Sequence, residues 1–151
     1  MVMSEVIMPK ESKVNKTYVS LWVEKQLFGI PVLQVQDVLL SQLVTPVPRA
    51  PKEVLGAINL RGRIVTVIDI RKKLNLAPAA EGSKTMQVVV TFDDELYSLV
   101  VDNVGDVLDL PSDTYSQNPD NLSPDWQMVS SGVYTMKDAL MIVLDIEKLL
   151  G

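Results

Sequence analysis

An internal repeat is the feature that most constrains how this chain can fold. Residues 23–39, VEKQLFGIPVLQVQDVL, align without a gap on residues 92–108, FDDELYSLVVDNVGDVL, at a constant separation of 69 residues. Residues 56–74 align in the same way on residues 132–150, at a separation of 76 residues. Each block holds six identical pairs, and the blocks occur in the same order in both halves. A duplicated unit explains this better than chance similarity between valine- and leucine-rich strands does.

Apolar and polar residues alternate through most of the chain, which is the pattern of half-buried β-strands. The expected strands are residues 17–23, 27–32, 57–60, 63–68, 86–92, 96–101, 132–136 and 139–144. The expected short helices are residues 33–39, 70–76 and 146–150. Each half then contains a hairpin, a short helix, a loop, a second hairpin and a second short helix. Short strands at this spacing predict a mainly β protein with a small barrel or sandwich architecture.

The repeat also predicts how the chain is divided. We expect one β-unit over residues 17–82 and a second over residues 83–151, joined around APAAEGSK (77–84). Units of this size bury too little surface to be stable alone, so we expect them to share a hydrophobic interface and fold as one body. Residues 1–16 predict a flexible N-terminal tail. Residues 111–131, rich in Pro, Asn, Asp and Ser, predict a long loop.

The composition excludes most kinds of chemistry. The 151 residues include no cysteine and no histidine, which rules out disulfides, Cys/His metal sites and a Ser-His-Asp relay. A net charge of −5 disfavours nucleic acid and anionic membranes as partners, and no apolar run is long enough to span a bilayer. The acidic run at residues 93–95 lies between two expected strands, where a solvated turn is a simpler explanation than a cation site. We expect no metal and no cofactor.

Two aspartates, Asp69 and Asp145, occupy matching positions in the repeat. An aspartic-protease pair is the catalytic alternative, but isoleucine follows each aspartate where that chemistry needs a hydroxyl residue and a glycine. Each aspartate ends a strand and precedes a short helix, which is the position of an N-cap. Gly56 and Gly132 also match and are interpreted as close-packed scaffold. We expect Gly62 to take a positive φ in a two-residue hairpin turn.

The halves diverge at residues 59–62, where the first half reads NLRG and the second reads TMKD. An Arg-Gly-Arg between two buried strands is consistent with a simple turn, an anion-binding site or a contact with another protein. A binding protein is the class left after elimination. A small β-barrel enzyme would instead gather several carboxylates in a deep pocket, and a nucleic-acid-binding barrel would show a continuous basic face.

The stretch PVPRAPKEVLGAINLRGRIVTVIDIRKKL, with FGIPVLQVQDVL upstream, resembles the CheW family of bacterial chemotaxis adaptors. The family's Gly-hydrophobic-x-Asn-Leu-Arg-Gly core corresponds to residues 56–62, and its Asp-hydrophobic-Arg ending corresponds to residues 69–71. The resemblance runs from about Tyr18 to Leu150. It implies one CheW-like domain over residues 17–151, built from two five-stranded SH3-like barrels packed together.

The resemblance also implies a function. Members are non-enzymatic adaptors that couple the cytoplasmic tips of methyl-accepting chemoreceptors to the regulatory domain of a CheA-type histidine kinase. Such a protein is expected in the cytoplasm, recruited to membrane-bound receptor arrays. A related adaptor of a pilus or gliding pathway is the alternative that the sequence leaves open.

Residue roles follow from the resemblance as expectations. The receptor-binding residues that it implies are Arg61, Val32, Asp37 and Val38. Core packing is the alternative for the two valines, and a capping or surface role is the alternative for Asp37. The kinase-binding residues that it implies are Thr45, Pro46, Val47 and Pro48, on a loop at the end of a barrel.

Overall fold

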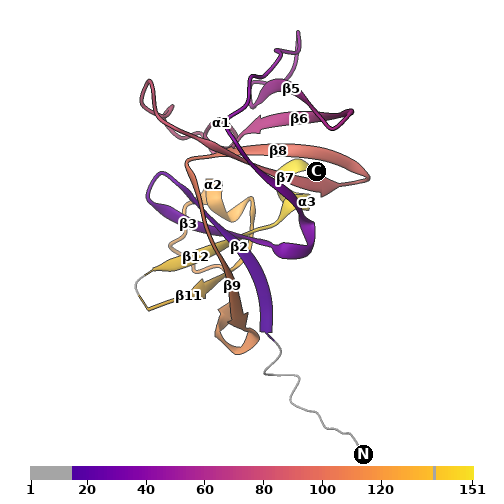
Figure 1. The fold of residues 1–151 in the computed structure, drawn as a ribbon. Coiled ribbons are helices and arrows are strands. Elements are labelled where there is room, and N and C mark those ends of the chain that lie inside the picture. The colour runs from indigo at the N-terminus through magenta and orange to yellow at the C-terminus, as the bar shows by residue number, and fades with distance from the viewer. Residues whose placement is uncertain (1–14, 138) are drawn as a thin grey trace, which may run out of the picture.

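The alternating pattern produces hairpins in both halves of the chain, as the computed structural model of residues 15–137 and 139–151 shows (Figure 1). The first half contains β2 (Asn15–Val23), β3 (Gln26–Pro31), the 3-10 helix η2 (Val32–Gln34), β4 (Val35–Leu40), β5 (Val54–Leu60), β6 (Arg63–Asp69) and α1 (Ile70–Lys73). The second half contains β7 (Met86–Phe92), β8 (Glu95–Val101), β9 (Asn103–Pro111), the 3-10 helix η3 (Ser112–Thr114), β10 (Tyr115–Ser116), α2 (Pro124–Gln127), β11 (Ser130–Thr135), β12 (Leu140–Leu144) and α3 (Ile146–Leu150). The predicted mainly β fold with short helices is confirmed.

The strands form two sheets, and each sheet takes strands from both halves of the chain (Figure 1). One sheet has the order β4-β7-β8-β6-β5, and the other has the order β10-β11-β12-β3-β2-β9. Five strands were expected in each barrel. The sheet that contains β4 has five, and the sheet that contains β10 has six because this two-residue strand is added to it. The hairpin β2–β3 thus joins strands of the second half, whereas β7–β8 joins strands of the first. The sheets therefore do not follow the predicted division at residue 82, because the halves exchange their first hairpins.

The exchange is reciprocal and uses equivalent parallel pairs. β6 runs parallel to β8, with Val67 opposite Ser98. β12 runs parallel to β3, with Val143 opposite Gly29. These two residue pairs correspond to each other in the repeat. The repeat shows which segments are duplicated, but pairing between distant strands decides which sheet each segment joins.

The helix predicted at residues 33–39 is wrong. Only Val32–Gln34 forms a 3-10 turn, and β4 follows it, antiparallel to β7. Partly buried and exposed residues alternate along β4, so pairing with β7 selects a strand in a segment whose valines and leucines also fit a helix. The equivalent segment of the second half is the strand β9, which pairs with β2. The predicted loop at residues 111–131 likewise contains η3, β10 and α2.

The predicted N-terminal tail covers residues 1–16, of which residues 1–14 lie outside the described part of the chain. Asn15 and Lys16 belong to β2, where they pair with Pro111 and Leu110 of β9. Pairing with β9 thus extends the first strand two residues beyond the start that alternation predicts.

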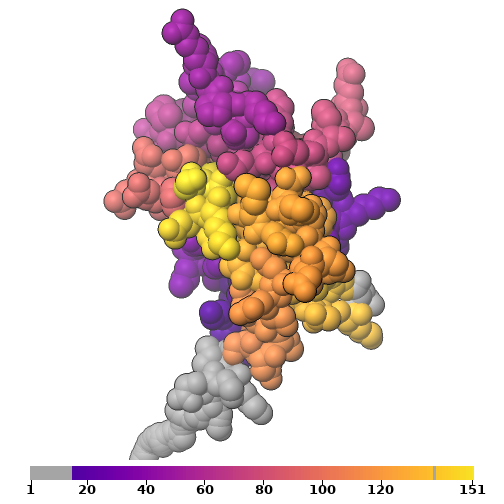
Figure 2. All heavy atoms as spheres, turned by 180° about the vertical axis from the view of Figure 1, so that it is seen from behind, coloured from indigo at the N-terminus to yellow at the C-terminus, as the bar shows by residue number. Residues whose placement is uncertain are grey.

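One hydrophobic cluster joins the two sheets. It includes Leu21 and Phe28 of the six-stranded sheet and Val88 and Leu99 of the five-stranded sheet, all fully buried. Apolar residues of α3 enter the same cluster, and Figure 2 shows this C-terminal helix, in yellow, at the junction of the two lobes. A smaller cluster lies on the opposite face of each sheet. Burial of apolar surface between the sheets therefore holds the molecule together as one body.

Each of the two matching aspartates caps a helix. Asp69 Oδ1 accepts a hydrogen bond from the backbone N–H of Arg71 at 3.0 Å, at the start of α1. Asp145 Oδ1 accepts one from the backbone N–H of Lys148 at 3.2 Å, at the start of α3. These bonds satisfy amide groups that have no partner within the first turn of a helix. The two carboxylates therefore serve separate helices.

The two matching glycines lie where the chain crosses from one edge of its sheet to the other. After β4, Thr45 forms an isolated antiparallel bridge with Ala57 of β5, with N···O distances of 2.9 and 2.8 Å. After β9, β10 pairs with β11 in the equivalent way. A Cβ at Gly56 would overlap the carbonyl oxygen of Thr45, and one at Gly132 would lie 2.7 Å from the carbonyl oxygen of Ser116. The close approach of the crossing chain therefore requires glycine at both positions.

We expect Gly56→Ala to lower the free energy of unfolding by about 3 kcal/mol or more, because the new Cβ meets backbone atoms and the φ of +149° strains an L-residue. Gly62→Ala is the matched control. Gly62 has a φ of +83° but open space around it, so we expect only a backbone cost of about 1–2 kcal/mol. Urea unfolding followed by circular dichroism measures both losses. Equal losses would contradict a crowding role for Gly56.

Candidate functional site

A tight turn presents Arg61 at the tip of the β5–β6 hairpin. Leu60 pairs with Arg63, which leaves Arg61 and Gly62 as a two-residue turn. Both have positive φ, +52° for Arg61 and +83° for Gly62, as a type I′ turn requires. Asn59 Oδ1 accepts a hydrogen bond from the Gly62 N–H at 2.9 Å. The NLRG sequence therefore builds a hairpin tip in which the only long side chain is an arginine.

An ion pair connects this tip to the far edge of the same sheet. Arg61 Nη2 lies 2.7 Å from Asp37 Oδ2, although β4 and β5 are the two edge strands. The side chain of Arg61 is 74% exposed and that of Asp37 is 24% exposed. Asp37 engages one nitrogen of the guanidinium, which has five N–H donors. The pair therefore orients Arg61 while leaving most of its donors facing solvent.

Asp37 is held in its charged form by this arrangement. The hydrogen bond from Arg61 lowers the pKa of the Asp37 carboxyl below its ordinary value, and the backbone N–H of Val38, 2.9 Å from Oδ1, lowers that pKa further. A hydrogen bond given to a carboxylate favours its ionised form. The structure thus gives Asp37 a local partner, in addition to the role that the resemblance implies.

Val38 follows Asp37 in β4, and its side chain lies on the opposite, more exposed face of the strand. Its side chain is 37% exposed, and Leu40, two residues further along the same face, is 72% exposed. The edge strand β4 therefore carries Asp37 of the ion pair on one face and two exposed apolar side chains on the other. We call Arg61, Asp37 and Val38 the Arg61 surface.

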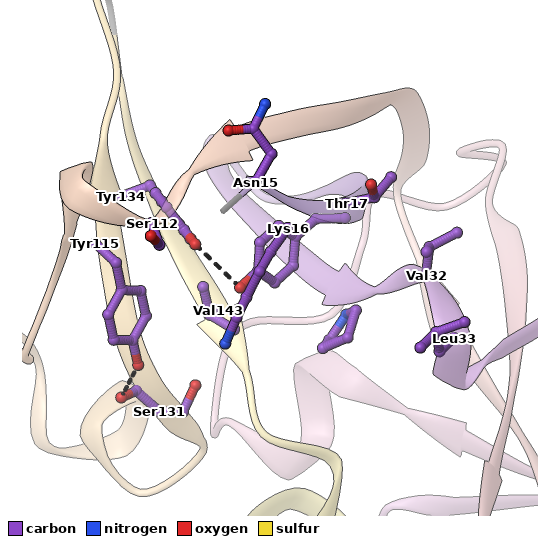
Figure 3. A pocket seen from close by; sticks show the side chains of 12 residues that line it. Asn15, Lys16, Thr17, Val32, Leu33, Ser112, Tyr115, Ser131, Tyr134 and Val143 are labelled. Carbon is purple, nitrogen blue, oxygen red and sulfur yellow. Dashed lines mark hydrogen bonds between the residues drawn. The ribbon is translucent and has the colours of Figure 1, made fainter. Parts of the chain in front are cut away.

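Val32 is not placed with the Arg61 surface. It lies in η2 and lines a cavity of about 660 Å³ at the end of the six-stranded sheet, together with Lys16, Tyr115 and Tyr134 (Figure 3). Tyr134 is buried, and its hydroxyl lies 3.2 Å from that of Tyr18. The side chain of Val32 is partly buried. Of the four expected receptor-binding residues, Arg61 and Asp37 are therefore in contact, Val38 lies on the other face of β4, and Val32 belongs to a different depression.

The expected kinase-binding residues lie in the connection between β4 and β5, which projects from the top of the molecule (Figure 2). All four are exposed, and Val47 is 46% exposed. Thr45 is held by its bridge to Ala57, and Pro46 packs where a Cβ of Gly56 would lie. Thr45 and Pro46 thus have a scaffold role, whereas Val47 extends beyond these contacts.

Arg71 is a residue to which sequence reasoning assigned no role. It belongs to the Asp-hydrophobic-Arg ending at residues 69–71, and it forms an ion pair with Asp102 at 2.6 Å. The partner is 31 residues away in sequence, so no local pattern identifies it. The Asp-hydrophobic-Arg motif was the one signal in the sequence that could have pointed to a role for Arg71.

Within residues 15–137 and 139–151, no three Asp or Glu side chains are grouped so that they could hold a metal ion. None of the helices in these ranges has the length and apolar character needed to cross a membrane.

Comparison with known proteins identifies the family of this chain. A family model described as CheW-like domain matches residues 17–151. Proteins called chemotaxis protein CheW are 32% identical in Klebsiella aerogenes, over 82% of this chain and 75% of the relative, and 26% identical in Bacillus subtilis, over 91% of this chain and 88% of the relative. Protein FrzA of Myxococcus xanthus is 32% identical over only 50% of this chain and 48% of the relative.

A solved structure supports the fold. The scaffolding protein TtCheW from Thermoanaerobacter tengcongensis matches with a TM-score of 0.79 at 23% identity, over 87% of this chain and 89% of that one. The chain belongs to the CheW-like domain family. It is a chemotaxis scaffold of the CheW type, an adaptor rather than an enzyme.

We expect Arg61→Ala to raise the pKa of Asp37 toward its ordinary value, because the largest cause of the lowered pKa is removed. Carbon NMR of the Asp37 carboxyl measures the change. Because the folded-state pKa is lowered, the ion pair stabilises the fold above the ordinary aspartate pKa, and this stabilisation is lost as pH falls through the folded-state value. Near pH 7 the exposed pair should contribute about 0.5 kcal/mol, and the variant and native protein should converge in acid. An unchanged Asp37 pKa would contradict the pairing.

Proposed function

We propose that this protein couples the cytoplasmic tips of methyl-accepting chemoreceptors to the regulatory domain of a CheA-type histidine kinase, by binding both without chemistry. It would act in the cytoplasm and be recruited to membrane-bound receptor arrays. Membership of the CheW-like domain family supports this proposal. The observation that carries it is the Arg61–Asp37 pair, which holds an oriented and largely exposed guanidinium at the edge strand β4, whose other face exposes Val38.

The Arg61 surface is the proposed receptor contact. Arg61 offers several N–H donors to carboxylates or backbone carbonyls of a receptor hairpin, and Val38 offers an apolar contact on the other face of the same edge strand. Arginine is among the residues most often found as hot spots at the centre of interfaces. Asp37 contributes by fixing the direction in which Arg61 points.

The projecting connection between β4 and β5 is the proposed kinase contact. Val47, with its two neighbouring prolines, forms a short and stiff apolar segment, because each proline restricts its own φ. A stiff loop loses little conformational entropy when a partner binds it. Thr45 and Pro46 hold the base of this segment, and Val47 and Pro48 are its candidate contacts.

We expect Arg61→Asp to weaken binding of a receptor-tip fragment by about 2 kcal/mol or more, which is the usual cost of losing a hot-spot arginine. Isothermal titration calorimetry measures the affinity. Lys72→Asp, at an exposed position on α1, makes the same change in net charge and is the matched control.

The double variant Asp37→Arg with Arg61→Asp separates contact from scaffolding. It restores an ion pair with the charges exchanged, so it should recover stability but not receptor affinity. Recovery of receptor affinity would mean that the receptor needs only the ion pair and does not touch the arginine. Unchanged affinity in a folded Arg61→Asp variant would overturn the assignment of the receptor surface.

We expect Val47→Asp to weaken binding of the kinase regulatory domain about tenfold, because a charge replaces an apolar contact at the proposed interface. Receptor affinity should stay unchanged, since Val47 lies outside the Arg61 surface. Met128→Asp makes the same kind of change at an apolar side chain that is 72% exposed elsewhere, and it serves as the control. Equal effects of the two substitutions on kinase binding would argue against a specific role for residues 45–48.

A further inference from the structure

The guanidinium of Arg71 is bonded on three sides. Nε and Nη2 donate to the two carboxylate oxygens of Asp102, at 3.1 and 2.6 Å. Nη1 donates to the carbonyl oxygen of Ala77 at 2.9 Å and lies 3.6 Å from a carboxylate oxygen of Glu24. Asp102 Oδ2 also accepts a hydrogen bond from the Glu24 N–H at 2.7 Å. We call Arg71, Asp102 and Glu24 the latch.

The latch connects one segment of each sheet with the segment that joins the two sheets. Arg71 lies in α1, directly after β6 of the five-stranded sheet. Glu24 lies in the turn between β2 and β3 of the six-stranded sheet. Asp102 lies between β8 and β9, where the chain passes from one sheet to the other. The latch therefore spans the junction of the two sheets.

This connection differs in kind from the hydrophobic cluster. Apolar contacts hold the sheets together but have no preferred direction. A guanidinium bonded to both oxygens of one carboxylate fixes both distance and orientation. Arg71 is only 16% exposed and Asp102 25% exposed, so solvent and salt weaken the pair less than they weaken a surface ion pair.

The repeat shows that the latch occurs on one side of the molecule alone. The positions equivalent to Arg71, Asp102 and Glu24 are Glu147, Leu33 and Asp93. Two acids and a leucine cannot form an ion pair with one another, and the side chain of Leu33 is 91% exposed. The duplicated frame alone thus does not require the latch.

The latch borders a groove next to the strand that carries the Arg61 surface. Asp102 and Asn103 line a groove of about 730 Å³ together with Leu40 of β4 and Met86 of β7. Leu40 and Val38 lie on the same exposed face of β4. A shift of Asp102 relative to β4 would change the width of this groove.

We infer that Arg71 is a positioning residue. By holding Asp102, it sets the spacing of the two sheets along this groove, and this spacing determines how β4 is presented to the receptor. The inference rests on the proposed receptor surface. Arg71 itself touches no partner in this arrangement and acts through Asp102. It also gives a role to the arginine of the Asp-hydrophobic-Arg ending, whose aspartate is already explained as a helix cap.

The test uses Arg71→Lys, which keeps the charge but cannot bond both carboxylate oxygens with one planar group. We expect affinity for the receptor-tip fragment to fall about fivefold, while affinity for the kinase regulatory domain stays unchanged. Arg49→Lys, at an exposed arginine, is the matched control. Both variants are measured at a temperature where circular dichroism shows them fully folded, because simple destabilisation would lower both affinities together.

A second measurement follows the spacing directly. The chain has no native cysteine, so Arg63→Cys and Thr135→Cys, one exposed position on each sheet, can carry a pair of spin labels. We expect Arg71→Lys to broaden the distance distribution between the labels and Arg49→Lys to leave it narrow. If Arg71→Lys does not fold, Asp102→Asn takes its place with the same expectation.

Two outcomes overturn the inference: an unchanged distance distribution, or an unchanged receptor affinity in a protein that still responds to Arg61→Asp. If Arg61→Asp also leaves receptor affinity unchanged, the proposed receptor surface itself is wrong, and the latch fails with it as a positioning device. A parallel fall in receptor and kinase affinity, with no change in spacing, would reduce Arg71 to a stabilising residue.

Discussion

The hydrophobic cluster between the two sheets is the interaction on which the rest of the structure depends. Each sheet takes one hairpin from the other half of the chain, so neither half completes a sheet alone. The consequence reaches the proposed receptor site. The hairpin β7–β8, from the second half, lies between β4 and β6, and it thereby sets how far Asp37 on β4 lies from Arg61 at the end of β5. An ion pair within the first half therefore has the geometry that the second half imposes.

Duplication supplies the frame, and the proposed functions lie where the two copies differ. Both copies keep the glycine under the crossing chain and the aspartate that caps the following helix, because each of these residues has the same structural task in each copy. Among the described residues, the ion pair of Arg61 with Asp37 and the latch of Arg71 with Asp102 have no counterpart at the matching positions of the repeat. Two equal halves would present two equal surfaces, whereas an adaptor that must orient different partners needs unlike surfaces. The divergence of the copies is consistent with this need.

Much of the fold could be predicted because its causes are local. The turn at Arg61 and Gly62 follows from the conformational freedom of glycine, and the cap at Asp69 follows from the unpaired amides of a helix start. The segment of β4 was mispredicted because its valines and leucines satisfy both periodicities, and only pairing with β7 decides between them. Val32 was grouped with Asp37 because the resemblance implies that both belong to the receptor-binding segment, but Val32 lies in the turn η2 before β4 and lines another depression.

The sequence by itself determined most of the strands, the duplication, the helix caps, the hairpin turn and the family, since each depends on residues close together in the chain or on recurrence along it. Only the tertiary structure decided the exchange of hairpins, the ion pair between Arg61 and Asp37, and the latch between Arg71 and Asp102. These features join residues 24 and 31 positions apart, and strands from opposite halves. Such contacts depend on which sheet edges meet when the shared core forms, and no local pattern of residues encodes that choice.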